Sequence, residues 1–150
     1  MNELQLQIEN LKTKISSGYV IAIEVDEGWY QLVLDCDTEL TAIDPNYKVL
    51  QIKEKFGGLR YYMSPSNETT LQQRDAMYDV IRKYEEAALR TCEATGKPGL
   101  LMRSSRGWVK TLNPEYAASK PHYAKYVPAL SHGWMLDDEN QSTEDEQGEC

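Results

Sequence analysis

Residues Tyr47 to Met63 read YKVLQIKEKFGGLRYYM, two runs rich in β-branched and aromatic residues that flank a pair of glycines. Gly57 and Gly58 tolerate the positive φ values of a tight turn. The runs Tyr47–Phe56 and Leu59–Met63 therefore predict a β-hairpin with the two glycines as its loop. This hairpin is the strongest local signal in the chain, and the other elements are placed around it.

The predicted pairing separates the hairpin into two faces. With the glycines as the loop, Phe56 lies opposite Leu59 and Lys55 lies opposite Arg60. The apolar face, which suits packing against a helix, carries Ile52, Phe56, Leu59, Tyr61 and Met63. The opposite face carries Lys53, Lys55, Arg60 and Tyr62. Two cations that face each other repel, so this face is either a solvated surface or a site for an anion.

Helices are predicted on both sides of the hairpin. Apolar residues recur every three or four positions from Asn2 to Ser16, which is typical of an amphipathic helix. Asp26 is the predicted N-cap of a second helix, which ends near Asp44. The longest predicted helix runs from Glu68 to Thr95, with Gly96 as its stop.

The C-terminal third predicts a smaller unit and a tail. Leu100–Arg103 and Trp108–Leu112 have the pattern of a second hairpin, and Asn113 then caps a short helix that ends at Ala118. Residues 137–150 have no apolar periodicity and are predicted to be a disordered acidic tail. The expected architecture is an α+β fold with one domain over residues 1–136.

Composition excludes several classes of protein. A hydrophobic content of 41% and a charged content of 27% are those of a globular chain, which excludes wholesale disorder. Three cysteines are too few for a disulfide scaffold and fit a reducing cytoplasm. No apolar run approaches the about 20 residues needed to cross a bilayer, so no membrane association is expected.

The net charge of −8 is unevenly distributed. Residues 1–44 hold two basic and nine acidic residues, whereas residues 45–125 hold fourteen basic and eight acidic residues. Residues 126–150 hold seven acidic residues and no basic ones. A basic centre therefore lies between two acidic ends, which the overall charge alone conceals.

Two candidate binding surfaces follow from this distribution. The basic candidates, on both hairpins, are Lys53, Lys55, Arg60, Tyr62, Arg103, Arg106, Trp108 and Lys110. Basic residues that alternate with aromatic ones suit phosphates or the carboxylates of a protein partner. The acidic candidates near the second helix are Glu24, Asp26, Glu27, Asp35, Asp37 and Glu39. Asp35, Asp37 and Glu39 are expected to project outward from that helix.

The distribution of several motifs resembles a known family. Gly28-Trp29 opens a helix, Gln51–Tyr62 carries the hairpin, a long helix ends at Cys92-Glu93, and Gly107-Trp108 leads to Thr111-Leu112. Together they resemble a small, functionally uncharacterised family of bacteria and their phages, over about Gly28 to Ala118.

The resemblance implies a zinc-ribbon-like module, and this chain departs from it. The family's Cys-x-x-Cys and Cys-x-x-His correspond here to Cys92, Thr95, Asn113 and Tyr116. Neutral Thr, Asn and Tyr side chains do not replace thiolates or imidazole around zinc, so no metal is expected. Cys92 is expected to be a buried apolar residue and Asn113 a helix cap.

No catalytic constellation is evident in the sequence, and neither enzymatic activity nor a cofactor is expected. The first function hypothesis is a protein-binding regulator or inhibitor, encoded by a phage, which uses charged surfaces against a host or defence protein. Its carboxylates would imitate a nucleic-acid backbone, although acidic surfaces also serve solubility alone. The alternative is a nucleic-acid-binding protein that uses the central basic hairpins. The oligomeric state is left open.

Overall fold

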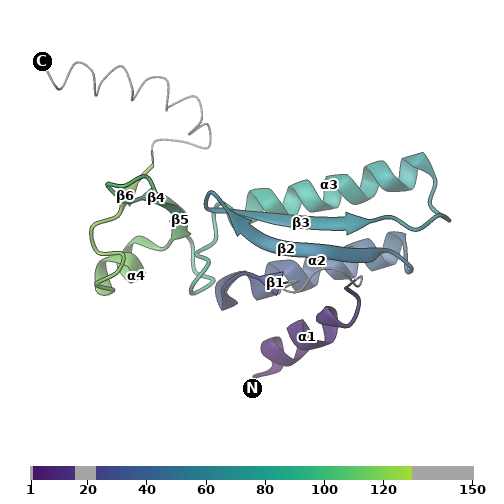
Figure 1. Ribbon diagram of the computed structural model, residues 1–150, viewed down its shortest axis with the longest axis horizontal. Coiled ribbons are helices and arrows are strands. Elements are labelled where there is room, and N and C mark those ends of the chain that lie inside the picture. The colour runs from purple at the N-terminus through teal and green to yellow at the C-terminus, as the bar shows by residue number, and fades with distance from the viewer. Residues whose placement is uncertain (1, 16–22, 130–150) are drawn as a thin grey trace, which may run out of the picture.

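The computed structural model describes residues 2–15 and 23–129, which form an α+β fold with two lobes (Figure 1). The large lobe (residues 2–15 and 23–90) contains helices α1 (Glu3–Lys12), α2 (Tyr30–Ile43) and α3 (Leu71–Ala88), the 3₁₀ turn Glu27–Trp29, and strands β1 (Ile23–Glu24), β2 (Lys48–Lys55) and β3 (Gly58–Ser64). The small lobe (residues 91–129) contains β4 (Leu100–Arg103), β5 (Val109–Leu112), α4 (Pro114–Ser119) and β6 (Val127–Pro128). The tail predicted for residues 137–150 lies outside the described residues, and the single domain over residues 1–136 stays a prediction.

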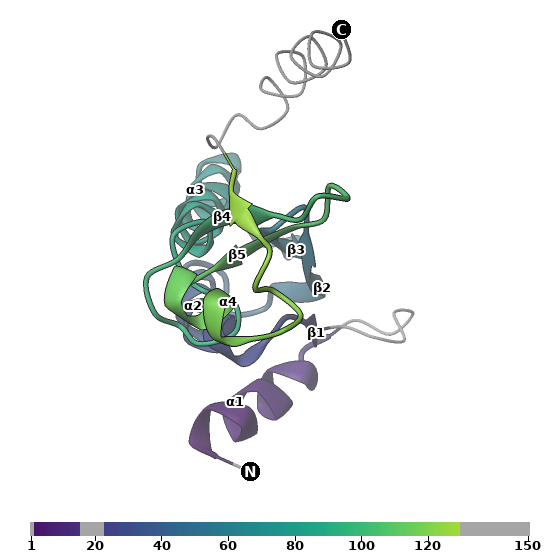
Figure 2. The ribbon, with the colours of Figure 1, turned by 90° about the vertical axis from the view of Figure 1, so that its left-hand side faces the viewer.

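The large lobe has two layers. Its sheet has the strand order β1-β2-β3, and α2 and α3 lie together against one face of it (Figures 1 and 2). The core between the layers contains the fully buried side chains of Trp29, Val33, Leu40, Ile52, Leu59 and Met77. We call the opposite face of the sheet, which these helices leave uncovered, the open face.

The predicted hairpin is present, but its loop lies one residue earlier than predicted, which shifts the strand register by two residues. The two loop residues are Phe56 and Gly57, with φ values of 54° and 80°, so Gly58 already pairs with Lys55. Lys53 rather than Lys55 therefore lies opposite Arg60. The turn is set by its contact with the small lobe, because the Gly57 carbonyl accepts a hydrogen bond from Thr111 Oγ1 at 2.7 Å.

A bulge further along the hairpin preserves its buried face. The ladder shifts between Val49 and Gln51, so Leu50 is the extra residue in β2. Val49 and Ile52 are three positions apart, yet both are fully buried. A regular alternation cannot place them on one face, which is why the period-two pattern missed this irregularity.

The longest helix is shorter than predicted. Thr70 and Gln73 form a capping box at the start of α3, and the helix ends at Ala88 rather than Thr95. Cys92 lies in a separate turn, where its N–H donates to Lys97 O at 2.8 Å and its carbonyl accepts from Gly96 N at 2.8 Å. The prediction that Gly96 stops the helix is therefore wrong, because it closes this tight turn with φ at 79°.

Two short strands, β1 and β6, were not predicted from the sequence. Residues Ile23 and Glu24 of β1 pair in parallel with Ile52 and Lys53 of β2. The short β6 pairs with β4 and completes a sheet with the order β5-β4-β6. A two-residue strand has no periodicity to detect, and both strands are formed by their hydrogen bonds to a neighbouring strand.

The ends of the other helices agree only in part with the predicted helix caps and bounds. Asn2 caps α1 with a capping box, and α1 ends at Lys12, before the predicted end at Ser16. Asp26 precedes the 3₁₀ turn without a capping hydrogen bond from its side chain, so its predicted role as an N-cap is wrong. Asn113 caps α4 as expected, because its side chain accepts the N–H of Tyr116 at 3.1 Å.

The border of the large sheet is covered by a side chain. Strand β3 lies at the edge of the sheet, and its Tyr61 N–H donates to Glu85 Oε2 of α3 at 3.3 Å. Glu85 is half-buried. Burial raises the pKa of the Glu85 carboxyl, an effect that the Tyr61 N–H partly offsets.

Polar contacts connect the two lobes. Gly28 N donates to Glu93 O at 2.7 Å, and Trp29 Nε1 donates to Thr91 O at 2.8 Å. A Cβ on Gly28 would lie 2.2 Å from Cys92 O, so only glycine permits this close approach. The segment before α2 is therefore bound directly to the turn that begins the small lobe.

Candidate functional site

The open face of the sheet carries basic and aromatic side chains. Lys53 lies opposite Arg60, and its Nζ is 6.0 Å from the ring centroid of Tyr62. Tyr62 is 41% exposed. Within residues 2–15 and 23–129, no carboxylate oxygen lies within 4.0 Å of the charged nitrogens of Lys53, Lys55 or Arg60. The hairpin thus presents cations that no ion pair with a described carboxylate neutralises.

A groove of about 540 Å³ lies between the tips of the two hairpins. We call it the tip groove. It is lined by Glu54, Lys55, Phe56, Arg106, Gly107, Trp108 and Val109. Phe56 is 47% exposed and Trp108 is 72% exposed, whereas Phe56 was predicted to lie on the apolar face. That prediction is wrong because Phe56 occupies the turn. The one carboxylate in this lining, Glu54, accepts the Gly57 N–H at 3.4 Å.

The second hairpin holds its tip in a defined conformation. Ser104 Oγ accepts the N–H groups of Arg106 and Trp108 at 3.3 and 3.1 Å, and Ser104 N donates to Trp108 O at 2.8 Å. Gly107 has a φ of 87°, which the turn requires. These bonds present Trp108 at the surface on a closed turn.

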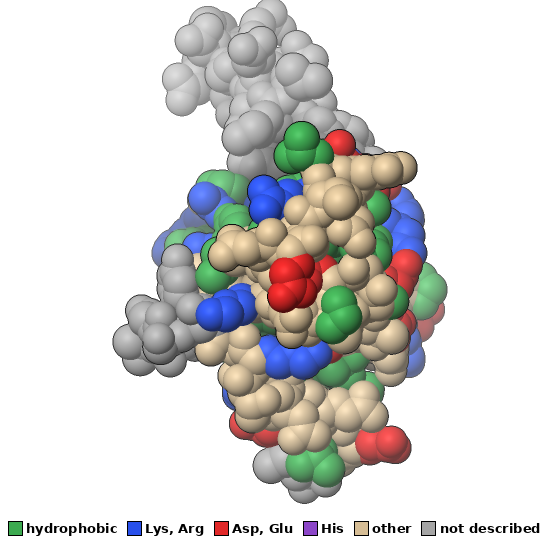
Figure 3. Space-filling view, turned by 90° about the vertical axis from the view of Figure 1, so that its right-hand side faces the viewer, with side chains coloured by type: hydrophobic (Ala, Val, Ile, Leu, Met, Phe, Trp, Pro, Cys, Tyr) green, Lys and Arg blue, Asp and Glu red, His purple; other side chains and the backbone are tan. Residues whose placement is uncertain are grey.

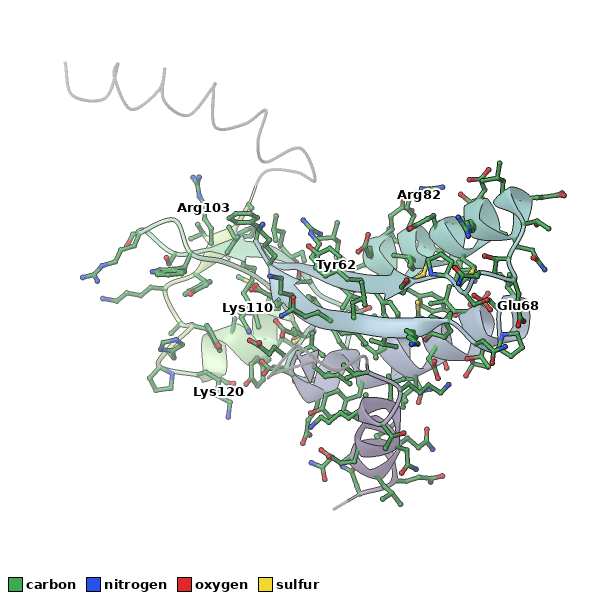
Figure 4. The ribbon with its side chains drawn as sticks, turned by 45° about the vertical axis from the view of Figure 1, so that its right-hand side comes forward. Tyr62, Glu68, Arg82, Arg103, Lys110 and Lys120 are labelled. Atoms are coloured by element: carbon green, nitrogen blue, oxygen red, sulfur yellow. The ribbon has the colours of Figure 1, made fainter. Side chains whose placement is uncertain are left out.

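Two basic candidates remain, Arg103 and Lys110, and Lys110 does not belong to this surface. Lys110 lies where the two lobes meet, whereas Arg103 extends outward from the small lobe (Figure 4). Lys110 Nζ is 3.0 Å from Glu93 Oε1 and 3.2 Å from Asp26 Oδ2. The expectation that Lys110 extends the basic surface is therefore wrong, because two carboxylates neutralise its charge.

The ion pair between Lys110 and Glu93, both of the small lobe, is largely buried, and Lys110 also reaches Asp26 of the large lobe. Burial raises the pKa of the Glu93 carboxyl, and Lys110 and the Asp26 N–H partly offset this effect. Burial alone would lower the pKa of Lys110, but the carboxylates of Glu93 and Asp26 outweigh it and hold that pKa above its usual value. Lys110 is thus held in its charged form, and its contact with Asp26 connects the small lobe to the large one.

The acidic candidates are divided between internal contacts and solvent. Asp37 was expected to project outward, but only 16% of its side chain is exposed, and it accepts hydrogen bonds from Lys14 at 3.2 Å and from Tyr47. Glu39 pairs with Lys83 at 2.7 Å and also accepts from Tyr84. Hydrogen bonds from Lys83 and Tyr84 lower the pKa of Glu39. The exposed members of the set are Glu24, Asp26, Glu27 and Asp35.

The end of the molecule away from the small lobe carries charges of both signs. Figure 3 shows lysine and arginine side chains interspersed with aspartate and glutamate on this face. Positive charge is thus not concentrated at this end, in contrast to the open face and the tip groove.

A buried polar network of Tyr47, Tyr61 and Asp37 lies beneath the sheet and was not predicted from the sequence. Tyr47 Oη lies 2.7 Å from Tyr61 Oη and donates to Asp37 of α2. Burial raises the pKa of both tyrosines, with the neighbouring phenol and carboxylate adding to the shift of Tyr47. The period-two pattern assigns Tyr61 to the apolar face, but it cannot show that an aspartate meets it there. Hydrogen-bonded in this way, the network stabilises the core.

The positions that correspond to the zinc module have other roles in this chain. Cys92 is fully buried, as expected, and Asn113 Nδ2 donates to Pro98 O at 2.8 Å. Thr95 Oγ1 accepts the N–H of Lys97 at 3.2 Å. The described part of the chain contains no group of three or more His, Cys, Asp or Glu side chains arranged to hold a metal ion.

Comparisons with protein-family models, curated proteins and solved structures find no match for this chain. The resemblance to the bacterial and phage family therefore stays a prediction. In the part of the chain that the structure describes, every helix is too short or too polar to cross a bilayer.

Proposed function

We propose that this chain is a non-enzymatic nucleic-acid-binding protein and that the open face and the tip groove are its binding surface. The observation that carries the proposal is the set of Lys53, Lys55, Arg60 and Arg106, which lie beside exposed aromatic rings without a described carboxylate within 4.0 Å. Cations bind phosphates, and aromatic rings bind bases by stacking.

The charge of the described residues is compatible with this function. They hold 16 basic and 17 acidic residues, so the net charge of −8 comes almost entirely from the seven acidic residues of the C-terminal segment. Five of the six candidate acidic residues are hydrogen-bonded or ion-paired within the chain: Asp26, Glu27, Asp35, Asp37 and Glu39. The acidic surface is thus more engaged internally than the basic one.

The salt dependence of binding tests the proposal. Lys53→Gln combined with Lys55→Gln removes two cations from the surface, so the slope of log K against log salt falls in magnitude by about 1.4 to 1.8 for labelled DNA. Fluorescence anisotropy at several salt concentrations measures this slope. Lys97→Gln combined with Lys120→Gln removes the same charge from exposed positions of the small lobe, outside the sheet and the tip groove, and leaves the slope nearly unchanged.

Truncation gives a second readout of the same proposal. Removing residues 137–150 deletes seven acidic and no basic residues, so the affinity for DNA rises most at low salt. Absence of binding at low salt, or an equal loss in both lysine pairs, would contradict the proposal.

The hypothesis that this chain regulates or inhibits a host or defence protein stays a prediction. It depends on the exposed carboxylates of Glu24, Glu27 and Asp35, because Asp37 is half-buried and paired. Reversing the charge of these three residues abolishes partner capture if the acidic surface is the binding element, and leaves DNA binding intact or stronger.

A further inference from the structure

The structure presents two aromatic side chains from separate hairpins at one groove. Phe56 belongs to the turn between β2 and β3, and Trp108 precedes β5. A tryptophan as exposed as Trp108 is unusual on a folded chain, because its large apolar area gains most from burial. The groove's volume of about 540 Å³ falls within the range of about 300 to 1,000 Å³ found for ligand sites.

The groove is built on a fixed frame. Thr111 Oγ1 donates to Gly57 O at 2.7 Å, and a Cβ on Gly57 would lie only 2.4 Å from Leu101 Cδ1. The first hairpin is therefore in direct contact with the second, and the relative position of their tips does not depend on the exposed rings themselves.

The backbone at Phe56 is strained. Its φ of 54° lies in the left-handed region, which bulky side chains rarely adopt and which asparagine or glycine occupies at lower cost. The strain holds a large aromatic ring at the turn, where a smaller residue fits the backbone better. Together with the exposed Trp108, this points to a role for both rings in contact with a ligand.

We infer that the tip groove binds unpaired nucleobases, which stack on Trp108 and Phe56 while Lys55 and Arg106 contact the adjoining phosphates. This inference rests on the proposed function and adds the class of ligand, single-stranded nucleic acid. In a duplex the faces of the bases are already stacked on one another, so only an unpaired base offers a face to these rings. The cations at the groove complement the phosphates, whereas its single carboxylate, Glu54, is hydrogen-bonded to Gly57.

Quenching of tryptophan fluorescence tests the inference directly. The experiment uses the full chain with the substitution Trp134→Phe. The fluorescence then comes from Trp29, which is fully buried, and from Trp108. A single-stranded oligodeoxynucleotide quenches the fluorescence on stacking, and the blunt duplex of the same sequence does not. A glutamate-rich peptide serves as the competing anionic ligand and produces no quenching.

Affinity measurements separate stacking from charge. Trp108→Ala weakens single-strand binding roughly 5- to 150-fold, which corresponds to the loss of one stacked base, while Trp108→Phe retains most of the affinity. Tyr78→Ala is the matched control, because Tyr78 is an exposed aromatic residue of α3 outside the groove, and it leaves the affinity unchanged. Circular dichroism verifies that each variant is folded.

The two proposals fail in different ways. Equal binding of duplex and single strand, no effect of Trp108→Ala, or quenching by the acidic peptide instead of DNA overturns the stacking inference. If the lysine pair at positions 53 and 55 still governs the salt slope, the nucleic-acid-binding function stands without it. If neither form of DNA binds at low salt, both proposals are overturned.

Discussion

Glycine is required at position 28 by the close approach of two backbones. Its φ is not in the left-handed region, so any residue can adopt its backbone conformation. The constraint is space, because a Cβ there would lie 2.2 Å from Cys92 O and 2.5 Å from Glu93 O. Gly107 is the opposite case, because its φ is 87° and a Cβ added there would meet nothing within 4 Å.

These two glycines predict different costs for the same substitution. Gly28→Ala forces the lobes apart and strains the hydrogen bond to Glu93 O, so it lowers the free energy of unfolding by about 3 kcal/mol. Gly107→Ala incurs only the cost of the left-handed backbone, about 1 kcal/mol. Urea unfolding at neutral pH measures both. Equal losses would show that close contact at Gly28 is not the constraint.

Individual residues were predictable where local chemistry decides their role. Asn113 precedes a proline at the first turn of a helix, and its capping is a property of these adjacent residues. Phe56 was misplaced because the register depends on which residues form the turn, and Gly57 is held there by Thr111, 54 residues further along the chain. No local pattern contains that contact.

At the scale of elements, one buried carboxylate connects the end of α2 to the loop before α3. Asp44 is 3% exposed and accepts hydrogen bonds from Ser66 N and Ser66 Oγ, both at 2.8 Å, and from Asn46 N at 3.3 Å. Burial by itself would raise the pKa of Asp44, but the hydrogen bonds from Ser66 and Asn46 outweigh it and lower that pKa.

This lowered pKa predicts a loss of stability in acid. The unfolded chain binds a proton at Asp44 near pH 3.9, above the pKa of the folded state, so the stabilisation is complete above about pH 5 and declines as pH falls. Asp44→Asn lowers the free energy of unfolding at pH 7 by about 1 to 3 kcal/mol and flattens its decline between about pH 5 and pH 3.

Urea unfolding at pH 7, 5 and 3 measures this dependence. Asp75→Asn, at an exposed position of α3, is the control and retains the pH profile of the original chain. An unchanged profile for Asp44→Asn would show that other carboxyl groups account for the acid sensitivity.

The elements themselves were predictable to different degrees. The two hairpins, α1, α2 and α4 were expected near their observed positions because each has a periodic pattern or a turn signal of its own. The end of α3 was misplaced, because the apolar spacing continues through Cys92 after the backbone has left the helix. There, the turn around Cys92 and Gly96 is stabilised by contacts with Gly28, which sequence periodicity does not reveal.

At the scale of the whole molecule, Lys110 of the small lobe pairs with Glu93 of the same lobe and with Asp26 of the large lobe, and Glu93 also accepts the Asp26 N–H. Lys110→Met leaves the Glu93 carboxylate buried without a cation, so it lowers the free energy of unfolding by about 3 to 5 kcal/mol. Combining it with Glu93→Gln removes the unpaired charge and restores most of the loss. Thermal or urea unfolding of the two variants measures the difference.

An exposed ion pair provides the comparison for this prediction. Lys12 and Glu9 on α1 are 43% and 51% exposed in their side chains, and Lys12→Met changes stability by less than about 1 kcal/mol. A similarly small change for Lys110→Met would mean that the contact between the lobes does not depend on this charge.

The candidate site was only partly predictable from the sequence. The alternation of charge and aromatic residues identified Lys53, Arg60 and Tyr62, because residues two apart share a face of a strand. That Lys110 is neutralised depends on carboxylates 84 and 17 positions earlier in the chain, which only the folded molecule brings together. The meeting of Phe56 and Trp108 at one groove is likewise a property of the tertiary structure.

The contact between Glu85 and the border of β3 also affects how molecules behave in concentrated solution. An unoccupied strand edge is a template on which another copy can add as an extra strand, and such additions begin fibrils. Glu85 occupies the Tyr61 amide with an acceptor from α3, which an incoming strand has to displace first. The helix that completes the core therefore also discourages aggregation from this border.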